Sequence, residues 1–132
     1  MQVKIDTKEK FTVATPITSY LTANIAAELI QKCNEMLHQP IKNVVLNMGL
    51  VEKIDENVVE TIMNLQQQFY DNSASFVICN LTKPINNQLE EMEIAELLNI
   101  TPTESEAWDI VQMEEIEREL LDGDDVNFEN NH

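Results

Sequence analysis

Hydrophobic and polar positions follow two different periods along this chain. Near the N-terminus, residues 3–7 and 11–15 alternate in character around the polar break Lys8-Glu9-Lys10, which predicts two short strands joined by a tight turn. Short runs rich in branched residues at 44–46 and 76–79 predict two further strands, each buried on both faces.

Apolar residues at spacings of three and four predict four helices in the other segments. The first two cover residues 23–37 and about 56–70, and the third begins at Pro84, where the missing backbone donor costs nothing. The last helix is expected to end near Gly123. Strands and helices in this order are typical of an α/β fold with right-handed crossovers and a largely parallel or mixed sheet.

Two of the helix starts carry capping signals. Asp55 comes directly before the second helix, and its carboxylate can accept hydrogen bonds from the free amides of the first turn. Thr103 and Glu106 have the spacing of a capping box ahead of the last helix. The end of the chain has neither periodicity nor enough apolar surface to dock, so we expect one domain over residues 1–121 and a disordered acidic tail over residues 122–132.

The chain is strongly acidic, with 24 Asp and Glu against 8 Lys and Arg and a net charge of −16. Arg118 is the one base in residues 101–132, where the acids are densest. Such a surface repels nucleic acid, so we expect no nucleic-acid partner. Only two glycines, Gly49 and Gly123, are present, which excludes a glycine-rich phosphate loop and a dinucleotide-binding motif, and we expect no cofactor.

The N-terminus and the cysteines indicate a cytoplasmic protein without membrane insertion. Charged Lys4 and Asp6 stand where a secretory signal needs an apolar run, and eighteen consecutive apolar residues occur nowhere. Cys33 and Cys79 lie in apolar stretches without a metal-binding spacing. We therefore expect buried free thiols and no metal site.

Candidates for catalysis are few, because the two histidines lie far apart in sequence, one at a helix end and one at the C-terminus. Glu52, Asp55, Glu56 and Glu60 form a cluster of acids, and two carboxylates held close together can raise the pKa of one of them. Acids at a helix start usually serve the helix dipole and solubility. We expect no enzyme, and turnover through these acids is the alternative.

The segment from Asn43 to Ile62 resembles a known family. A buried strand, a short connection, a hydrophobic residue followed by aspartate, and then a helix is the layout of STAS domains, the bacterial anti-sigma factor antagonists. Three further segments agree in order and spacing: Leu21-Thr22-Ala23-Asn24 at a helix entry, Phe76–Asn80 ahead of the helix start at Pro84, and Glu96–Ile100 before the last helix. The resemblance covers about residues 2–121.

This resemblance implies a mixed, mostly parallel sheet of four to five strands with helices packed on one side, and a domain that binds proteins without a reaction of its own. Family members that switch partners carry a serine directly after the aspartate, and a kinase-like anti-sigma factor phosphorylates it to break the complex. Here Asp55 matches the aspartate, while Glu56 replaces the phosphorylatable serine, Asn57 a second serine and Val58 a glycine. We expect these four residues to bind the partner, with Val58 at a corner that faces it.

Glu56 has two explanations. Phosphoserine would place about −1.5 to −2 charges at the helix N-terminus, and Glu56 places one negative charge there permanently, so the surface is locked in a phosphate-like state. Alternatively, Glu56 is an ordinary first-turn acid that stabilises the helix by a few tenths of a kcal/mol. The expected partner is an anti-sigma or kinase-like regulator; the alternative role is an accessory subunit of a membrane transport system.

The last helix leaves two further alternatives. Its many glutamates are expected to form a solvated face, and the other interpretation is a docking surface for a basic partner. Trp108 is expected in the core from its place in the periodic pattern, and the other interpretation is an anchor for a partner.

Overall fold

The computed structural model describes the backbone of residues 2–130 and the side chains of residues 2–121. In chain order the elements are β1 (Val3–Thr7), β2 (Thr12–Pro16), β3 (Tyr20–Leu21), α1 (Ala23–Met36), β4 (Val44–Asn47), β5 (Lys53–Ile54), α2 (Glu56–Asp71), β6 (Phe76–Cys79), α3 (Lys83–Glu91), a short 3₁₀ helix (Ala95–Leu97), β7 (Ile100–Thr101) and α4 (Glu104–Asn130).

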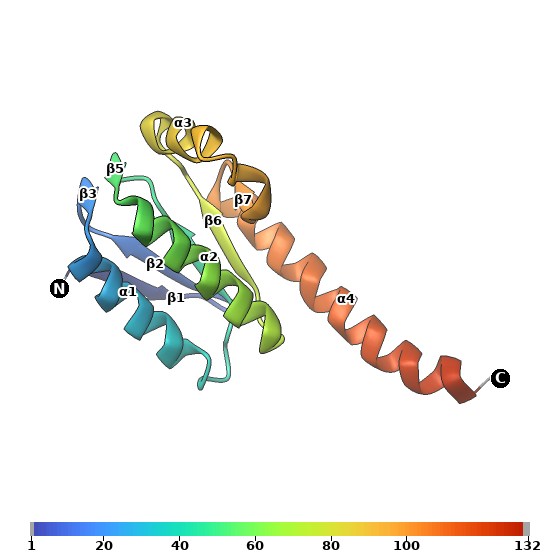
Figure 1. Cartoon of the computed structure of the whole chain (residues 1–132). Helices are drawn as coiled ribbons and strands as arrows, with labels where there is room; N and C mark the ends of the chain where they lie inside the picture. The colour runs from blue at the N-terminus through green and yellow to red at the C-terminus, as the bar shows by residue number, and fades with distance from the viewer. Residues whose placement is uncertain (1, 131–132) are drawn as a thin grey trace.

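Five strands form one mixed sheet in the order β1-β2-β4-β6-β7 (Figure 1). β1 and β2 are the antiparallel hairpin expected around the break at residues 8–10, and every other neighbouring pair is parallel. The polar turn is closed by the amide of Lys8, which donates to the carbonyl of Phe11 at 2.8 Å. The predicted α/β class, with a mostly parallel sheet of four to five strands, is confirmed.

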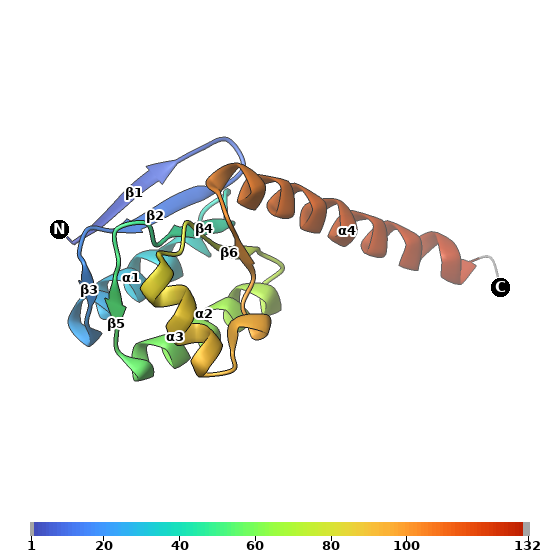
Figure 2. The same cartoon turned by 90° about the horizontal axis from the view of Figure 1, so that it is seen from above.

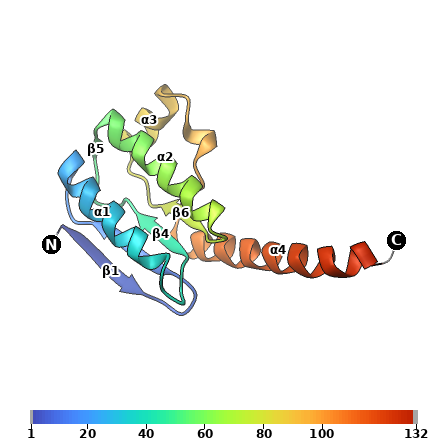
Figure 3. The same cartoon turned by 60° about the horizontal axis from the view of Figure 1, so that its bottom comes forward.

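One face of this sheet packs against α1 and α2, which lie side by side over it (Figure 3). Alternate residues of the central strands, among them Leu46 and Ile78, point to this face and are buried. They form one cluster with Leu29 of α1 and Phe69 of α2. The apolar stripes predicted for the two helices therefore pack into the larger of the two core clusters.

The opposite face packs against the first turns of α4, which Figure 2 shows on the far side of the sheet from α1 and α2. Val45 and Val77 point to this side and are buried together with Ala107 and Val111 of α4. The expectation that the helices pack on one side is therefore wrong for α4. The physical reason is that β4 is apolar from Val44 to Leu46 and β6 is apolar along its whole length, so both faces of these strands need cover.

The start of α4 has the structure that its sequence predicts. The amide of Glu106 donates to the Thr103 hydroxyl at 3.2 Å, which is the first of the two bonds of a capping box. The same hydroxyl donates to the Glu106 carboxylate at 3.1 Å. The Trp108 ring packs against Phe11, with 5.3 Å between ring centroids, and borders the smaller of the two core clusters. Trp108 is thus half-buried against the edge of the core, on the side of the helix that its periodic position indicates.

The far end of α4 differs from the prediction. The helix continues to Asn130 and projects beyond the sheet in all three views (Figures 1–3). Gly123 does not end it, because a glycine inside a helix costs only about 1 kcal/mol relative to alanine. A glycine stop needs the left-handed conformation, whereas Gly123 lies inside the span of α4. The division into a domain at 1–121 and a disordered tail at 122–132 stays a prediction, and residues 131–132 lie outside the described chain.

Both cysteines are free and buried, as the sequence predicts. Burial raises the pKa of the Cys33 and Cys79 thiols to about 12, so both are protonated at neutral pH. Over the described residues, no helix combines the length and the hydrophobicity needed to cross a bilayer.

Candidate functional site

The predicted site lies where a small second sheet leads into α2. β3 and β5 pair in parallel outside the main sheet, with Tyr20 opposite Lys53 and Leu21 opposite Ile54. The carbonyl of Ser19 accepts from the amide of Lys53 at 2.9 Å. The last residue of β5 is one position from Asp55, so this pairing sets the direction in which α2 starts.

Two side chains at α3 bind the segment from Val51 to Ile54, which leads into α2, on the side away from β3. The Thr82 hydroxyl donates to the carbonyl of Val51 at 2.6 Å, and the Gln88 side-chain amide donates to the carbonyl of Ile54 at 2.9 Å. Val51 itself is fully buried. With β3 on one side and these two side chains on the other, the chain ahead of α2 is fixed through backbone groups that any sequence would present.

Asp55 occupies the N-cap position of α2 but does not cap it with its side chain. Its backbone carbonyl accepts from the amides of Val58 and Val59 at 3.0 and 3.2 Å. Its carboxylate instead accepts a hydrogen bond from the Tyr20 hydroxyl at 2.5 Å. The prediction that the carboxylate bonds to first-turn amides is therefore wrong, because a phenol from β3 reaches it.

Tyr20 and Lys53 complete this arrangement, and neither was among the expected site residues. The hydrogen bond to the Asp55 carboxylate raises the pKa of the Tyr20 hydroxyl above its ordinary value. The Lys53 ammonium lies 4.7 Å from the centroid of the Tyr20 ring, within the range of a cation–π contact. The residue pattern contains no signal for these contacts, since Tyr20 and Asp55 are 35 positions apart.

Glu56 and Asn57 are exposed in the first turn of α2. Val58 is not: only 2% of it is accessible, and it packs in the larger core cluster with Val59 and Ile62. The expectation that Val58 faces the partner is wrong because its position belongs to the inward stripe of the helix. We call the surface made by Tyr20, Lys53, Asp55, Glu56 and Asn57 the α2 corner.

Three of the four clustered acids lie at the surface of the domain. Glu52, Glu56 and Glu60 are exposed, and the remaining acid, Asp55, is bonded to Tyr20. Among the side chains that the structure describes, no group of three or more His, Cys, Asp or Glu residues could hold a metal ion.

A comparison with families of known sequence agrees with this architecture. The sequence profile of the STAS domain matches residues 2–107, about four fifths of the chain. The chain belongs to the STAS domain family. The match includes every strand, α1 to α3 and the α2 corner, and it ends within the first turns of α4. Among curated protein sequences, none matches this chain.

Solved structures with the same fold include STAS-type regulators and part of a transporter. A candidate anti-sigma factor antagonist from Thermotoga maritima superposes with a TM-score of 0.72 at 18% identity, over 83% of this chain and 94% of that one. The Bacillus anti-sigma factor antagonist SpoIIAA in its unphosphorylated form gives 0.63 at 12% identity, over 83% and 97%. The murine anion transporter Slc26a9 gives 0.63 at 13%, over 80% of this chain and 18% of the transporter. At these identities the likeness establishes the fold.

Proposed function

We propose that this chain is a non-enzymatic regulatory module of the bacterial cytoplasm that binds a protein partner through the α2 corner, in the manner of an anti-sigma factor antagonist that acts in transcription. One observation carries the proposal. Glu56 is exposed in the first turn of α2, directly after an aspartate whose side chain is bonded to Tyr20. In partner-switching STAS domains this next position is the phosphorylatable serine.

The charge at this position is permanent in this chain. Glu56 adds one negative charge at the helix N-terminus, where the helix dipole favours it by about 0.3–1 kcal/mol. Phosphoserine would add about −1.5 to −2 charges and three acceptor oxygens. A carboxylate cannot accept the phosphoryl group as a stable serine-type ester, so we propose that the α2 corner is held in a state that resembles the phosphorylated one.

Site-specific crosslinking tests whether the corner meets a partner. A photoreactive phenylalanine analogue replaces Asn57, which is exposed and bonds to its surroundings only through its backbone carbonyl. The control carries the same analogue at Glu35, an exposed residue at the opposite end of the helical layer. We expect a protein that crosslinks at position 57 and not at position 35. Equal crosslinking at both positions would overturn the assignment of the α2 corner.

A matched pair of substitutions tests the role of Glu56. Glu56→Ser restores the serine, and Glu60→Ser makes the same change at an exposed position one turn further along α2. If Glu56 acts as a phosphate-like charge, Glu56→Ser strengthens binding to the crosslinked partner and Glu60→Ser does not. If both variants bind like the wild type, the carboxylate serves only the helix start.

The likeness to part of an anion transporter supports a second candidate, an accessory subunit of a membrane transport system. The same crosslinking experiment separates the two functions through the identity of the protein captured at position 57. A kinase-like or sigma-regulating protein supports the antagonist function. An ATPase or a permease supports the transport function and excludes the first.

A further inference from the structure

The face of α4 that meets the domain changes from apolar to polar along the helix. Ala107 and Val111 are buried against the sheet. Positions 114, 115 and 118 follow on the same face at helical spacing, and they hold Glu114, Glu115 and Arg118, all half-buried. An amphipathic surface helix normally keeps its apolar residues on the side of the core. From residue 113 to residue 120, α4 instead has polar residues on the side of the core and apolar residues on the outside.

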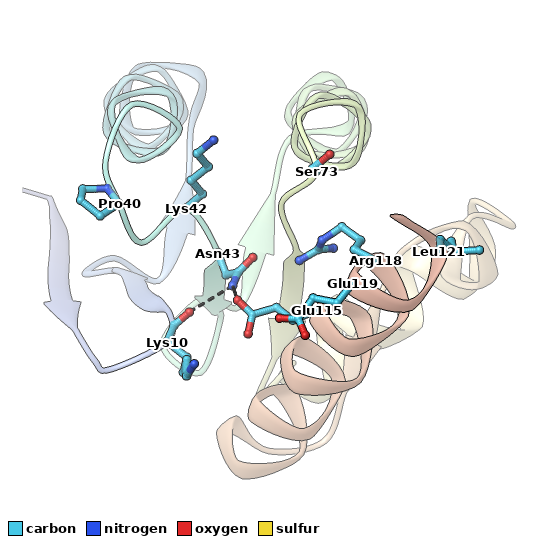
Figure 4. Close-up of a pocket in the computed structure, with 9 residues that line it drawn as sticks. All are labelled: Lys10, Pro40, Lys42, Asn43, Ser73, Glu115, Arg118, Glu119 and Leu121. Carbon is cyan, nitrogen blue, oxygen red and sulfur yellow. Dashed lines mark hydrogen bonds between the residues drawn. The ribbon is translucent and has the colours of Figure 1, made fainter. Parts of the chain in front are cut away.

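Hydrogen bonds hold this polar face against the ends of two strands. The Ser75 hydroxyl donates to the Glu114 carboxylate at 2.5 Å, and Arg118 donates to the same hydroxyl oxygen at 3.3 Å. The Asn43 side-chain amide donates to the Glu115 carboxylate at 2.8 Å and to the carbonyl of Lys10 at 3.1 Å (Figure 4). Asn43 and Ser75 are themselves buried, so α4 is attached here by polar groups from inside the domain.

The apolar residues of this half lie on the outside. Met113, Ile116 and Leu120 are 53%, 56% and 56% exposed. At about 100° per residue they lie roughly opposite Val111 around the helix. Their spacing of three and four is that of a coiled-coil seam. We call these three residues the outer stripe.

Charge determines what can cover the outer stripe. Glu117 and Glu119 lie on either side of it, both exposed, at the positions that select a partner in a coiled coil. A second copy would place acid against acid in an antiparallel pair of stripes, and every copy carries a net charge of −16. Nucleic acid and anionic lipid are repelled for the same reason. Lysine or arginine at the facing positions would instead form ion pairs.

We propose that the outer stripe of α4 binds a basic amphipathic helix of another protein. This surface is separate from the α2 corner, because α4 and α2 cover opposite faces of the sheet. Apolar side chains of the partner cover Met113, Ile116 and Leu120, while its basic side chains face Glu117 and Glu119. The chain then has two binding surfaces, one at the start of α2 and one on the outer face of α4.

Two labelled peptides and the full chain test this proposal by fluorescence anisotropy. Both are three-heptad helices with leucine in the seam; the first has lysine at the flanking positions and the second has glutamate there. We expect the lysine peptide to bind with saturation and the glutamate peptide not to bind. Failure of the lysine peptide to saturate would overturn the proposal.

Three double variants locate the binding. Ile116→Gln with Leu120→Gln removes apolar surface without a change of charge and is expected to weaken lysine-peptide binding at least about tenfold. Glu117→Lys with Glu119→Lys is expected to lose the lysine peptide and gain the glutamate peptide. Glu90→Lys with Glu91→Lys, at exposed positions of α3, makes the same change of charge elsewhere and is expected to retain most of the binding.

Two results would contradict the proposal even if the lysine peptide binds. Unchanged affinity in the glutamine variant would mean that net charge alone attracts the peptide. A dimer of the wild-type chain in light scattering that becomes a monomer in the glutamine variant would mean that a second copy covers the outer stripe. All three variants change exposed residues, so circular dichroism equal to that of the wild type is the check on their fold.

Discussion

Tyr20 and Asp55 are joined by a hydrogen bond that links two segments 35 positions apart, the phenol of one to the carboxylate of the other. The bond attaches the N-cap residue of α2 to β3, a strand outside the main sheet. It also keeps the carboxylate away from the first-turn amides, which a helix-start aspartate would otherwise accept from. The position of the α2 corner therefore depends on a contact between side chains as well as on the helix.

Removal of Asp55 is expected to lower the pKa of Tyr20 toward the ordinary value for tyrosine, about 10. The folded state raises this pKa, so the contribution of the contact to stability is complete below the pKa of the unfolded chain and is lost as pH rises through the higher folded value. Absorbance at alkaline pH measures the titration. Because the chain has only two tyrosines, Tyr70→Phe leaves Tyr20 as the single signal, and Tyr70 is 74% exposed. Equal midpoints with and without Asp55→Ala would contradict the contact.

Val58→Ala is expected to lower the free energy of unfolding by about 1.5–2 kcal/mol. Two buried methyl groups contribute about 0.8 kcal/mol each, a cavity adds to the loss, and the better helix propensity of alanine offsets part of it. Urea denaturation measures the change. Asn57→Ala, next to it and exposed, is the control and is expected to lie within about 0.5 kcal/mol of the wild type. If the two variants were equally stable, Val58 would not be part of the core.

The polar attachment of α4 is expected to show coupling between Ser75 and Glu114. Because Ser75 is buried and bonded to a carboxylate, Ser75→Ala should cost about 1.5–3 kcal/mol. A double-mutant cycle with Glu114→Ala measures the coupling energy, and Trp108 fluorescence reports whether α4 is still docked. Ser105→Ala, at an exposed position of α4, is the control. Additive effects at Ser75 and Glu114 would show that the two side chains do not interact.

The two thiols are expected to resist a thiol reagent in the native protein. Burial raises the pKa of Cys33 and Cys79 to about 12, and the thiolate is the reactive form. At pH 8 both should react only as the chain unfolds, so the rate should rise with urea in parallel with loss of the fold. Rapid reaction of one thiol in the absence of denaturant would place that cysteine at the surface.

Much of the fold could be predicted because its signals are local. The apolar stripes of α1 and α2 and the apolar runs of β4 and β6 can each be recognised from the residues of a single continuous segment. The apolar runs of β4 and β6 also predict that both faces of the sheet are buried, whereas the resemblance to a family suggested that all helices pack on one side. In the same way Val58 belongs to the stripe of α2, and only its match to a glycine of the family motif suggested a surface position.

The rest of the candidate site could not be predicted, because it depends on contacts between distant segments. β3 and β5 have two residues each, too few for a period of two to be recognised. Their pairing brings Tyr20 to Asp55 and Lys53, and no pattern within either segment encodes this. The polar side of α4 is a similar case. In the sequence, Glu114 and Glu115 look like part of a solvated face, and only the folded structure shows that they accept hydrogen bonds from Ser75 and Asn43.

The parallel pairing of β3 with β5 also bears on how the protein is assembled. Parallel neighbours require a crossover, and here α1 and β4 make up that connection. Closing a loop of this length costs entropy before any contact offsets it, so we expect β3 and β5 to pair after α1 and β4 have formed. A chain emerging from the ribosome has no α2 corner until α1 and β4 are in place. Under the proposed function, an unfinished chain would therefore lack the surface that binds the partner and would not compete for it.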